Sequence, residues 1–542
     1  MRPLVDVAAD LGISPAALQP YGNFAAKVDP ARIDAPAPAA PKLILVSAIT
    51  PTPAGEGKTT TTIGLGDALA RLGHRVCIAL REPSLGPCMG IKGGGTGGGR
   101  AQVVPSDRIN LHFTGDFHAI TSAHNLIAAV LDNHIHFDRE PDIDPRRVLW
   151  PRVLDMNDRA LRHIVLGLGG KANSIPREGG FDITAASELM AILCLAEDAD
   201  DLRRRIDRIL VAFARTGEPV AAAALRTTGA ALALLRDAMF PNLVQTLEGT
   251  PALVHGGPFA NIAHGCNSVI ATKLGLRVAD WVVTEAGFGF DLGAEKFYDI
   301  KCRSAGLDTA AVVLVASVRA LKLHGGVAVD ALDRPNPDAV DRGLPNLEKH
   351  IENIHMFTEL PVVALNRFGA DTDEEIDVVR RFCSDRGIEF AVAEHFDRGA
   401  EGAVDLARAV VRQAERDQTR FRPLYELAQS VPDKIRAVAT RMYGASDVAF
   451  TKQAERDLAD IARLGYDKLP VCIAKTHSSL SDDPKLRGRP RDFDVTVRAI
   501  QINAGAGFLV VLTGDILRMP GLPRTPRAES IDLHGQDVVG LQ

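Results

Sequence analysis

The sequence has few of the features that mark secreted, membrane or metal-binding proteins. Its seven cysteines are odd in number and widely scattered, without a C-x-x-C pair, which excludes a zinc knuckle and a redox motif of that kind. No apolar run approaches the ~18 residues of a membrane span, and Asp6 and Asp10 interrupt the segment where a signal peptide has its apolar core. We therefore expect a cytoplasmic protein with buried thiols and no membrane partner.

The chain also lacks a strong excess of charge of either sign. A formal net charge of −6 and a pI near 6.2 argue against a nucleic-acid partner, while leaving room for local basic pockets that bind small anions. Apolar residues at 46% and charged residues at 24% are typical of a soluble globular protein. At roughly 100–200 residues per domain, the length predicts about three domains, which we place at residues 1–360, 361–420 and 421–542.

The first part of the chain predicts an α/β fold. Residues 1–34 are expected to form a short helical arm, and "KLILVSA" at residues 42–48 is typical of a strand buried on both faces of a parallel sheet. A helix over residues 59–72 and a second strand ending at Arg81 follow. Further candidate strands begin at His163, Trp281, Ala310 and Pro361. This alternation predicts a doubly wound, mostly parallel sheet of the P-loop type in a large N-terminal domain, followed by two smaller α/β domains.

The loop after the first strand, "TPAGEGKT" at residues 52–59, has the composition of a phosphate-binding loop. Gly55 and Gly57 permit tight bends, Lys58 can reach the outer phosphates of a nucleotide, and the Thr59 hydroxyl can bind Mg²⁺. An ordinary turn before a helix is the alternative for a bare G-K-T triplet, and the strand on either side of this unit argues against it. The candidate phosphate-binding residues are Thr52, which stands where the usual motif has glycine, Pro53, Ala54, Gly55, Glu56, Gly57, Lys58 and Thr59.

Arg81 and Glu82 follow the second strand, at the carboxyl edge where open α/β sheets bind ligands. An arginine there can hold a carboxylate or an acyl phosphate with two hydrogen bonds, although a surface Arg–Glu pair fits the position equally well. The nearby "GGGTGGG" at residues 93–99 has the composition of a flexible linker. Its location beside the phosphate loop favours instead a mobile flap whose amides close on a ligand.

Five histidines between residues 112 and 136 invite a metal-site interpretation. Their spacing does not place them on one helical face, and no i, i+4 pair has a carboxylate partner, so we expect no transition-metal site. Asp116, which follows Gly115, is a better candidate to hold Mg²⁺ or orient a phosphate, and a helix-capping role is equally consistent with its position.

Two aromatic residues in the second half of the chain form another candidate site. Phe368 and Phe396 each follow a predicted strand, and together they would make a flat slot for a planar heterocycle. Taken alone, each is more typical of a hydrophobic core. The glycine-rich segment at residues 284–297 also contains Glu285, and it fits a ligand site or simple close packing.

Long strings of the sequence resemble the formate–tetrahydrofolate ligase family in its single-function bacterial form. They include "TPAGEGKTT", "REPSLGP", "LHFTGDFHAI", "FDITAASELMAILCLA", "PNLVQTLEGTPALVHGGPFANIAHGCNS", "DLGAEKF", "AKTHSSLSDDPKL" and "GDILRMPGLP". The resemblance runs from about residue 20 to the end of the chain. It implies that formate attacks the terminal phosphate of MgATP to give formyl phosphate, and that tetrahydrofolate then takes the formyl group to give 10-formyltetrahydrofolate and phosphate.

The resemblance also implies roles for the residues already singled out. By analogy, residues 52–59 hold ATP, Lys58 neutralises the migrating phosphoryl group, and Arg81 with Glu82 borders the formyl phosphate. Phe368 and Phe396 match the family's pterin clamp in the domain at 361–420, although the usual residue at the second position is tryptophan. The resemblance also implies a homotetramer that is activated by a monovalent cation such as K⁺ or NH₄⁺.

Two other classes of protein share parts of this pattern. A regulatory or partitioning ATPase of the deviant P-loop type carries a second lysine five residues before the loop lysine, and here that position is Pro53. A folate-binding scaffold without catalysis would not need the intact Lys58. The ligase interpretation is therefore the one that we expect the structure to support.

Overall fold

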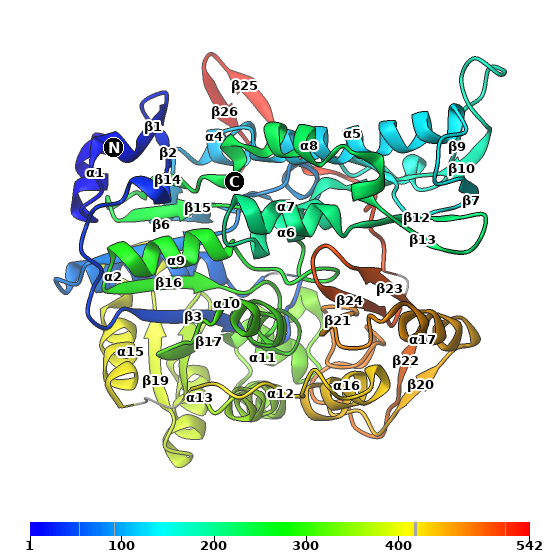
Figure 1. The fold of residues 1–542 in the computed structure, drawn as a ribbon. Helices are drawn as coiled ribbons and strands as arrows, with labels where there is room; N and C mark the ends of the chain where they lie inside the picture. Colours follow the sequence, from blue (N-terminus) through cyan, green and yellow to red (C-terminus); the bar gives the residue numbers. More distant parts are fainter. Residues whose placement is uncertain (54, 92, 417–419, 515, 542) are drawn as a thin grey trace.

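The computed structural model describes residues 1–53, 55–91, 93–416, 420–514 and 516–541. A sheet of twelve strands forms the centre of this described part (Figure 1). Its main path runs β1 (Leu18–Tyr21), β2 (Ala25–Val28), β14 (Asn242–Thr246), β15 (Pro251–Val254), β4 (Val76–Leu80), β16 (Trp281–Glu285), β3 (Lys42–Ala48), β17 (Ala311–Ser317), β18 (Pro361–Asn366) and β19 (Glu389–Ala393), with β6 (Ala101–Val104) beside β14 and β5 (Gly97–Gly98) beside β6.

The strands from β15 to β19 along this path are all parallel, whereas β1, β2, β6 and β14 pair antiparallel. The predicted mixed α/β fold with a large, mostly parallel sheet is therefore confirmed. Strands β18 and β19, from the segment 361–420, extend this same sheet. The division into three domains stays a prediction.

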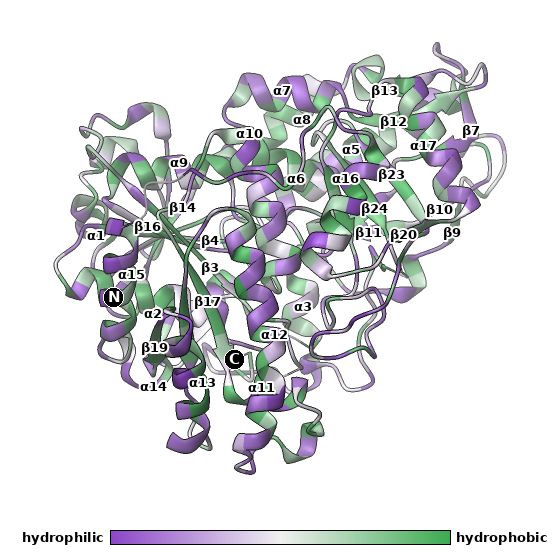
Figure 2. Cartoon of the chain, turned by 90° about the horizontal axis from the view of Figure 1, so that it is seen from below, coloured by the Kyte–Doolittle hydropathy of each residue, from purple (hydrophilic) through white to green (hydrophobic). Residues whose placement is uncertain are grey.

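Both faces of the sheet are buried, as the apolar run at residues 42–48 predicts. Leu43 and Leu45 of β3 belong to one hydrophobic cluster, and Ile44 and Val46 belong to another, because successive side chains of a strand point to opposite faces. Figure 2 shows the central strands as hydrophobic and the helices around them as mixed. Parallel strands covered on both faces are held by apolar packing on each side.

Helices cover each face of the sheet (Figure 1). The α-helices of the described residues are α1 (Leu4–Asp10), α2 (Lys58–Arg71), α3 (Leu85–Met89), α4 (Ser106–Asn110), α5 (Asp116–His136), α6 (Glu188–Leu195), α7 (Ala199–Asp207), α8 (Thr228–Leu235), α9 (Val269–Val278), α10 (Arg303–Ala305), α11 (Val318–His324), α12 (Pro337–Met356), α13 (Asp373–Asp385), α14 (His395–Arg398), α15 (Val404–Arg416), α16 (Val431–Val438) and α17 (Lys452–Leu464). Helices α2 and α15 pack on the Ile44 face, and α11, α12 and α13 pack on the Leu45 face. None of these helices is long and apolar enough to cross a membrane.

Smaller sheets flank the large one. They are β7 (Ile143–Val148) with β12 (Leu210–Ala214) and β13 (Pro219–Ala221), β8 (Arg152–Leu154) with β11 (Phe181–Ile183), β9 (Ile164–Leu166) with β10 (Arg177–Gly179), β21 (Val471–Ala474) with β24 (Phe508–Leu512) and β23 (Ala499–Asn503), β20 (Val448–Phe450) with β22 (Val495–Val497), and β25 (Asp532–His534) with β26 (Asp537–Val539).

Two sequence-based expectations about elements are wrong in part. The first 34 residues contain helix α1, and they also contribute β1 and β2 to the large sheet instead of forming a helical arm alone. The candidate strand beginning at His163 is the short β9, which pairs with β10 outside the large sheet. In both places a neighbouring segment supplies the pairing partner, and apolar runs along the chain carry no information about that partner.

Candidate active site

The residues singled out by the sequence gather at one edge of the large sheet. The phosphate loop follows β3, Arg81 and Glu82 follow β4, and Phe368 and Phe396 follow the neighbouring strands β18 and β19. Because these strands are parallel, all of their carboxyl ends lie along the same edge. This edge is where open α/β sheets bind ligands.

The phosphate loop contains the tight bends that its glycines predict. Gly55 and Gly57 have φ values of 74° and 75°, in the left-handed region that favours glycine, and Gly57 caps α2. The side chain of Glu56 is buried and accepts a hydrogen bond from the Thr52 amide at 2.9 Å, which closes the loop on itself. Pro53 is exposed, and Ala54 lies outside the described residues.

Lys58 is the first residue of α2, so the helix starts one residue earlier than the sequence predicts. Burial lowers the pKa of its ammonium group, and the negative charges of Glu56 and Glu285 oppose that shift. Within the part of the chain that the structure describes, Lys58 forms no ion pair within 4 Å. The ammonium group is therefore available to a bound anion at the end of a helix whose dipole also favours negative charge.

Thr59, Glu285 and Arg81 form a polar row beside the loop. The Thr59 hydroxyl donates to Glu285 Oε2 at 2.8 Å, and Arg81 Nη2 lies 3.7 Å from Glu285 Oε1. Arg81 also donates to the Pro258 carbonyl at 3.3 Å. Glu285 ends β16, between β3 and β4, and the sequence placed it only in a glycine-rich segment without a role. Its partners Thr59 and Arg81 come from the segments that follow the two neighbouring strands, β3 and β4, so we count Glu285 among the candidate site residues.

Glu82 and Asp116 belong to a buried cluster next to this row. Asp116 is the first residue of α5 and is 1% exposed, with Lys27 Nζ 2.7 Å away and the Asn242 amide donating to it at 2.7 Å. Burial raises the pKa of Glu82 well above its ordinary value, and the charge of Asp116 raises it further. The predicted Mg²⁺ or phosphate role of Asp116 stays a prediction, and Lys27 and Asn242 are among its partners in the fold.

A cavity of about 260 Å³ opens between these strand ends. Thr59, Arg81, Glu82, Glu285, residues 93–95, Gly257, Phe259, Phe288 and His477 are among the residues that line it. The rings of Phe288 and His477 stack with centroids 4.6 Å apart, although the two residues are far apart in the sequence. Phe288 has a φ of 60°, an uncommon conformation for a residue with a side chain and one that often marks functional sites. No local pattern in the sequence marks either residue as part of a site.

The glycine segment at residues 93–99 is not the free linker that its composition suggests. Residues 93–95 line the cavity, and Gly97–Gly98 forms β5 against β6. A Cβ atom on Gly99 would lie 2.3 Å from the Phe396 carbonyl oxygen, so only glycine fits this contact. Arg100 then donates its amide to the same carbonyl at 2.8 Å. The segment thus joins the cavity to the second aromatic residue, and closure on a ligand stays a prediction.

The two aromatic residues differ in their surroundings. Phe396 is 52% exposed on the short helix α14, which excludes a place in the hydrophobic core. Phe368 is half-buried, with the Arg319 guanidinium 5.6 Å from its ring centroid. Both therefore offer ring surface at the sheet edge.

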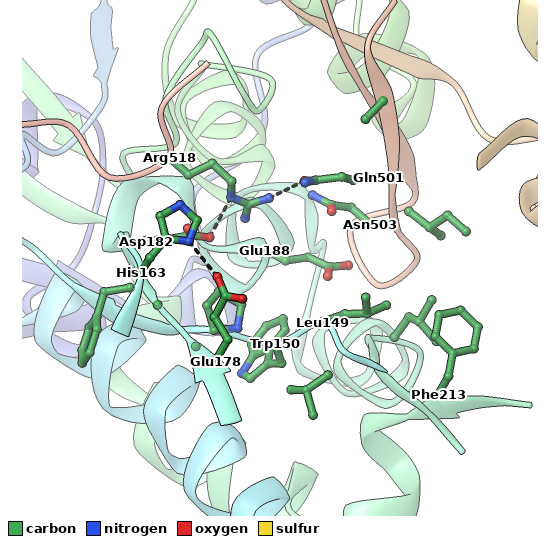
Figure 3. A pocket seen from close by; sticks show the side chains of 18 of the residues that line it. Leu149, Trp150, His163, Glu178, Asp182, Glu188, Phe213, Gln501, Asn503 and Arg518 are labelled. Atoms are coloured by element: carbon green, nitrogen blue, oxygen red, sulfur yellow. Dashed lines mark hydrogen bonds and ion pairs between the residues drawn. The ribbon is translucent and has the colours of Figure 1, made fainter. Parts of the chain in front are cut away.

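A second and larger cavity lies elsewhere and is lined by residues of β7, β10, β11, β12, α17 and β23 (Figure 3). It measures about 650 Å³ and includes Trp150, Glu188 and Arg518 in its lining. None of the residues predicted for phosphate or pterin binding that the structure describes is part of that lining. Likewise, among the described residues no group of three or more His, Cys, Asp or Glu side chains is placed to hold a metal ion.

Comparison with known protein families identifies the family of the chain. The family model described as formate–tetrahydrofolate ligase matches residues 1–542, which is the whole chain. The strings that carry the resemblance and the strand ends that gather the site thus belong to one continuous match. The chain belongs to the formate–tetrahydrofolate ligase family, whose members use ATP to join formate to tetrahydrofolate and form 10-formyltetrahydrofolate.

Proposed function

We propose that the family's reaction takes place in this chain at the sheet edge between the phosphate loop and the aromatic pair, Phe368 and Phe396. The reaction passes through a formyl phosphate intermediate. The observation that carries the proposal is the position of the phosphate loop, Arg81, Glu285 and the two phenylalanines at the ends of parallel strands of one sheet. The family match covers the whole chain and gives no support to the regulatory ATPase alternative.

In the first step, a formate oxygen attacks the terminal phosphorus of ATP, and the bond to the bridging oxygen breaks to release ADP. Such a transfer depends mostly on positioning and on cancelling charge. Lys58 and the phosphate loop at residues 52–59 hold the phosphates, while Arg81, which follows β4, holds the formyl phosphate oxygens. Arg81 is already oriented for this by Pro258 and Glu285.

Mg²⁺ accompanies ATP in the family's reaction, and two side chains here fit it. The Thr59 hydroxyl and the Glu285 carboxylate are 2.8 Å apart beside the loop, and oxygen ligands of these two kinds suit Mg²⁺. When bound, the ion neutralises charge that develops on the phosphate oxygens. Thr59 and Glu285 are the residues that we assign to it.

In the second step, the N10 amine of tetrahydrofolate attacks the formyl carbon, phosphate leaves, and the amine loses a proton. Phe368 and Phe396 stack on the pterin and place the amine near the cavity. The glycine segment that lines the cavity and contacts Phe396 keeps water from the reactive anhydride. By analogy with the family, we also propose a homotetramer activated by K⁺ or NH₄⁺, with residues 361–420 and 421–542 as smaller domains.

The test is an incubation with MgATP, formate and tetrahydrofolate in which each reactant is omitted in turn. We expect phosphate and 10-formyltetrahydrofolate to appear in equal amounts only when all three are present. Phosphate release that needs neither formate nor tetrahydrofolate would overturn the proposal.

A further inference from the structure

The structure links the two halves of the proposed site through residues that neither substrate has to touch. Asn366 ends β18, two residues before Phe368, and its side chain points at the phosphate loop. Its Nδ2 donates to the Glu56 carbonyl at 2.7 Å, and a Cβ atom on Gly57 would lie 2.5 Å from the same nitrogen. Asn366 is 6% exposed. The loop backbone therefore rests directly on the strand that carries the first aromatic residue.

His395 makes a second link from the other aromatic residue. It directly precedes Phe396 and is 1% exposed, with Nε2 lying 3.4 Å from the Thr61 hydroxyl. Its ring packs on Gly64 of α2 so closely that a Cβ atom there would lie 2.5 Å from the His395 Cβ. Helices α14 and α2 are therefore in direct contact (Figure 2).

Thr61 joins these two links to the phosphate loop. Its hydroxyl donates to the Gly57 carbonyl at 3.0 Å and lies 3.4 Å from Asn366 Oδ1. Burial lowers the pKa of His395 to about 4, so its ring is neutral near pH 7 and one nitrogen can accept a hydrogen bond. These contacts form one buried network that connects Gly57 to Asn366, two residues before Phe368, and to His395, which precedes Phe396.

We propose that Asn366 and His395 are positioning residues that couple the phosphate loop to the aromatic pair, so that nucleotide and folate each strengthen the binding of the other. The inference rests on the proposed function, because it assumes a nucleotide at the loop and a pterin at the phenylalanines. A loop held by a nucleotide fixes the Glu56 carbonyl and Gly57, and through them the ends of β18 and β19. Coupling between two sites is reciprocal, so folate has the same effect on the nucleotide.

The sheet itself does not need this network. Strand β18 is already paired with β17 over residues 361–366 and with β19 over residues 362–366. A buried asparagine is costly unless its polar atoms are paired, and here the donor is used on a neighbouring loop. This arrangement favours a role in positioning over one in simple stability.

The experiment measures the dissociation constant of tetrahydrofolate with and without MgADP, and that of MgADP with and without tetrahydrofolate. In the parent protein we expect each ligand to tighten the other by about 5-fold or more, at the lower end of typical coupling. Asn366→Ala and His395→Ala should each bring the ratio of the dissociation constants measured without and with the other ligand toward 1. Asn366→Ser provides a second variant at the first position in case the alanine variant does not fold.

The matched control is Asn353→Ala, which removes another buried asparagine whose Nδ2 donates to a backbone carbonyl, that of Met442 at 2.9 Å. It should keep the parent ratio, because it lies on α12 and touches neither the loop nor the aromatic pair. A parent ratio of 1, or an unchanged ratio in the folded Asn366 and His395 variants, would overturn the proposal. A parent protein that forms no product would instead overturn the proposed function itself.

Discussion

In the proposed transfer, Lys58 is the cation that neutralises the migrating phosphoryl group. It starts α2 directly after a left-handed glycine, and within the described residues no carboxylate neutralises it within 4 Å. We expect Lys58→Ala to lower the rate of ATP-dependent formylation by about 10²–10³-fold, the usual cost of removing one preorganised group that stabilises developing charge. The measurement is initial ADP release with all three reactants, together with a circular dichroism spectrum that should remain unchanged.

Lys273→Ala is the control for this prediction. Lys273 is partly exposed and pairs with Glu197 at 2.8 Å on the surface, so its loss should leave the rate near that of the parent. A Lys58→Ala protein that turns over at the parent rate would remove the phosphate loop from the mechanism.

The resemblance places Phe396 at a position where tryptophan is usual in the family, and the Phe396 ring is 52% exposed at the sheet edge. We expect Phe396→Trp to lower the KM for tetrahydrofolate and Phe396→Ala to raise it, because a larger ring offers more stacking surface. Aromatic contacts are worth about 0.5–1.5 kcal/mol, which corresponds to about 2- to 10-fold in binding. As a control, Phe137→Ala, which removes another exposed phenylalanine, should leave the KM for tetrahydrofolate unchanged. Equal constants in the parent and both Phe396 variants would place the pterin elsewhere.

At the scale of single residues, the sequence predicts those whose chemistry depends on local spacing. Gly55, Gly57 and Lys58 are recognisable because a phosphate loop needs bends and a cation at fixed distances along the chain. Glu285 and His477 are not, because their importance depends on strands and loops that become neighbours only in the folded protein.

At the scale of elements, continuous apolar runs predicted β3, β16, β17 and β18 correctly, since a strand buried on both faces has few polar residues. The same signal missed β1 and β2, which are short and lie in a segment that also contains helix α1. Strand β2 is fully buried, yet its sequence AAKV contains Lys27, whose charge is balanced by Asp116 from a distant helix. An apolar pattern cannot reveal a strand whose buried charge is paired elsewhere.

The contact between α2 and α14 gives a prediction for an element pair. A methyl group at Gly64 would meet the His395 side chain at 2.5 Å, which forces α14 and its Phe396 away from the phosphate-loop helix. We expect Gly64→Ala to raise the KM for tetrahydrofolate by more than it raises the KM for ATP, measured under the same initial-rate conditions. A shift confined to ATP would contradict this account.

Gly229→Ala is the matched control for the helix substitution. Gly229 lies in α8, where an added Cβ would meet no atom within 4 Å and the backbone has no positive φ. The substitution should stabilise the protein by about 0.4–1 kcal/mol, through reduced freedom of the unfolded chain, and leave both constants unchanged.

At the scale of the whole molecule, segments from across the chain meet in ways that local patterns do not encode. His477, from the C-terminal segment, completes a cavity whose other walls come from the first 300 residues. Glu188 of α6 makes a similar long-range contact, because its Oε1 accepts hydrogen bonds from the Gly505 and Ala506 amides at 2.8 and 3.1 Å. The family model matches both segments of each such contact, whereas apolar periodicity along the chain does not indicate which segments meet.

The Glu188 contact makes the stability of the molecule depend on pH. Burial raises the pKa of Glu188 from 4.5 to about 7, and the amides of Gly505 and Ala506 and the charge of Arg518 only partly offset this shift. A carboxyl group with a raised folded-state pKa holds its proton in the folded protein and loses it in the unfolded chain between these values. Its contribution to stability is therefore greatest below about pH 4.5 and declines as the pH rises to about 7.

Glu188→Gln keeps an oxygen that can accept from both amides and removes the ionisation. At roughly 1.4 kcal/mol per pKa unit, the variant should gain up to about 3 kcal/mol over the parent between pH 5 and pH 8. The measurement is the unfolding midpoint in urea across this range, with Glu178→Gln as the control, because Glu178 is 78% exposed at the rim of the same cavity (Figure 3). Parallel pH profiles for the parent and Glu188→Gln would show that the buried carboxyl of Glu188 does not set the pH dependence of stability.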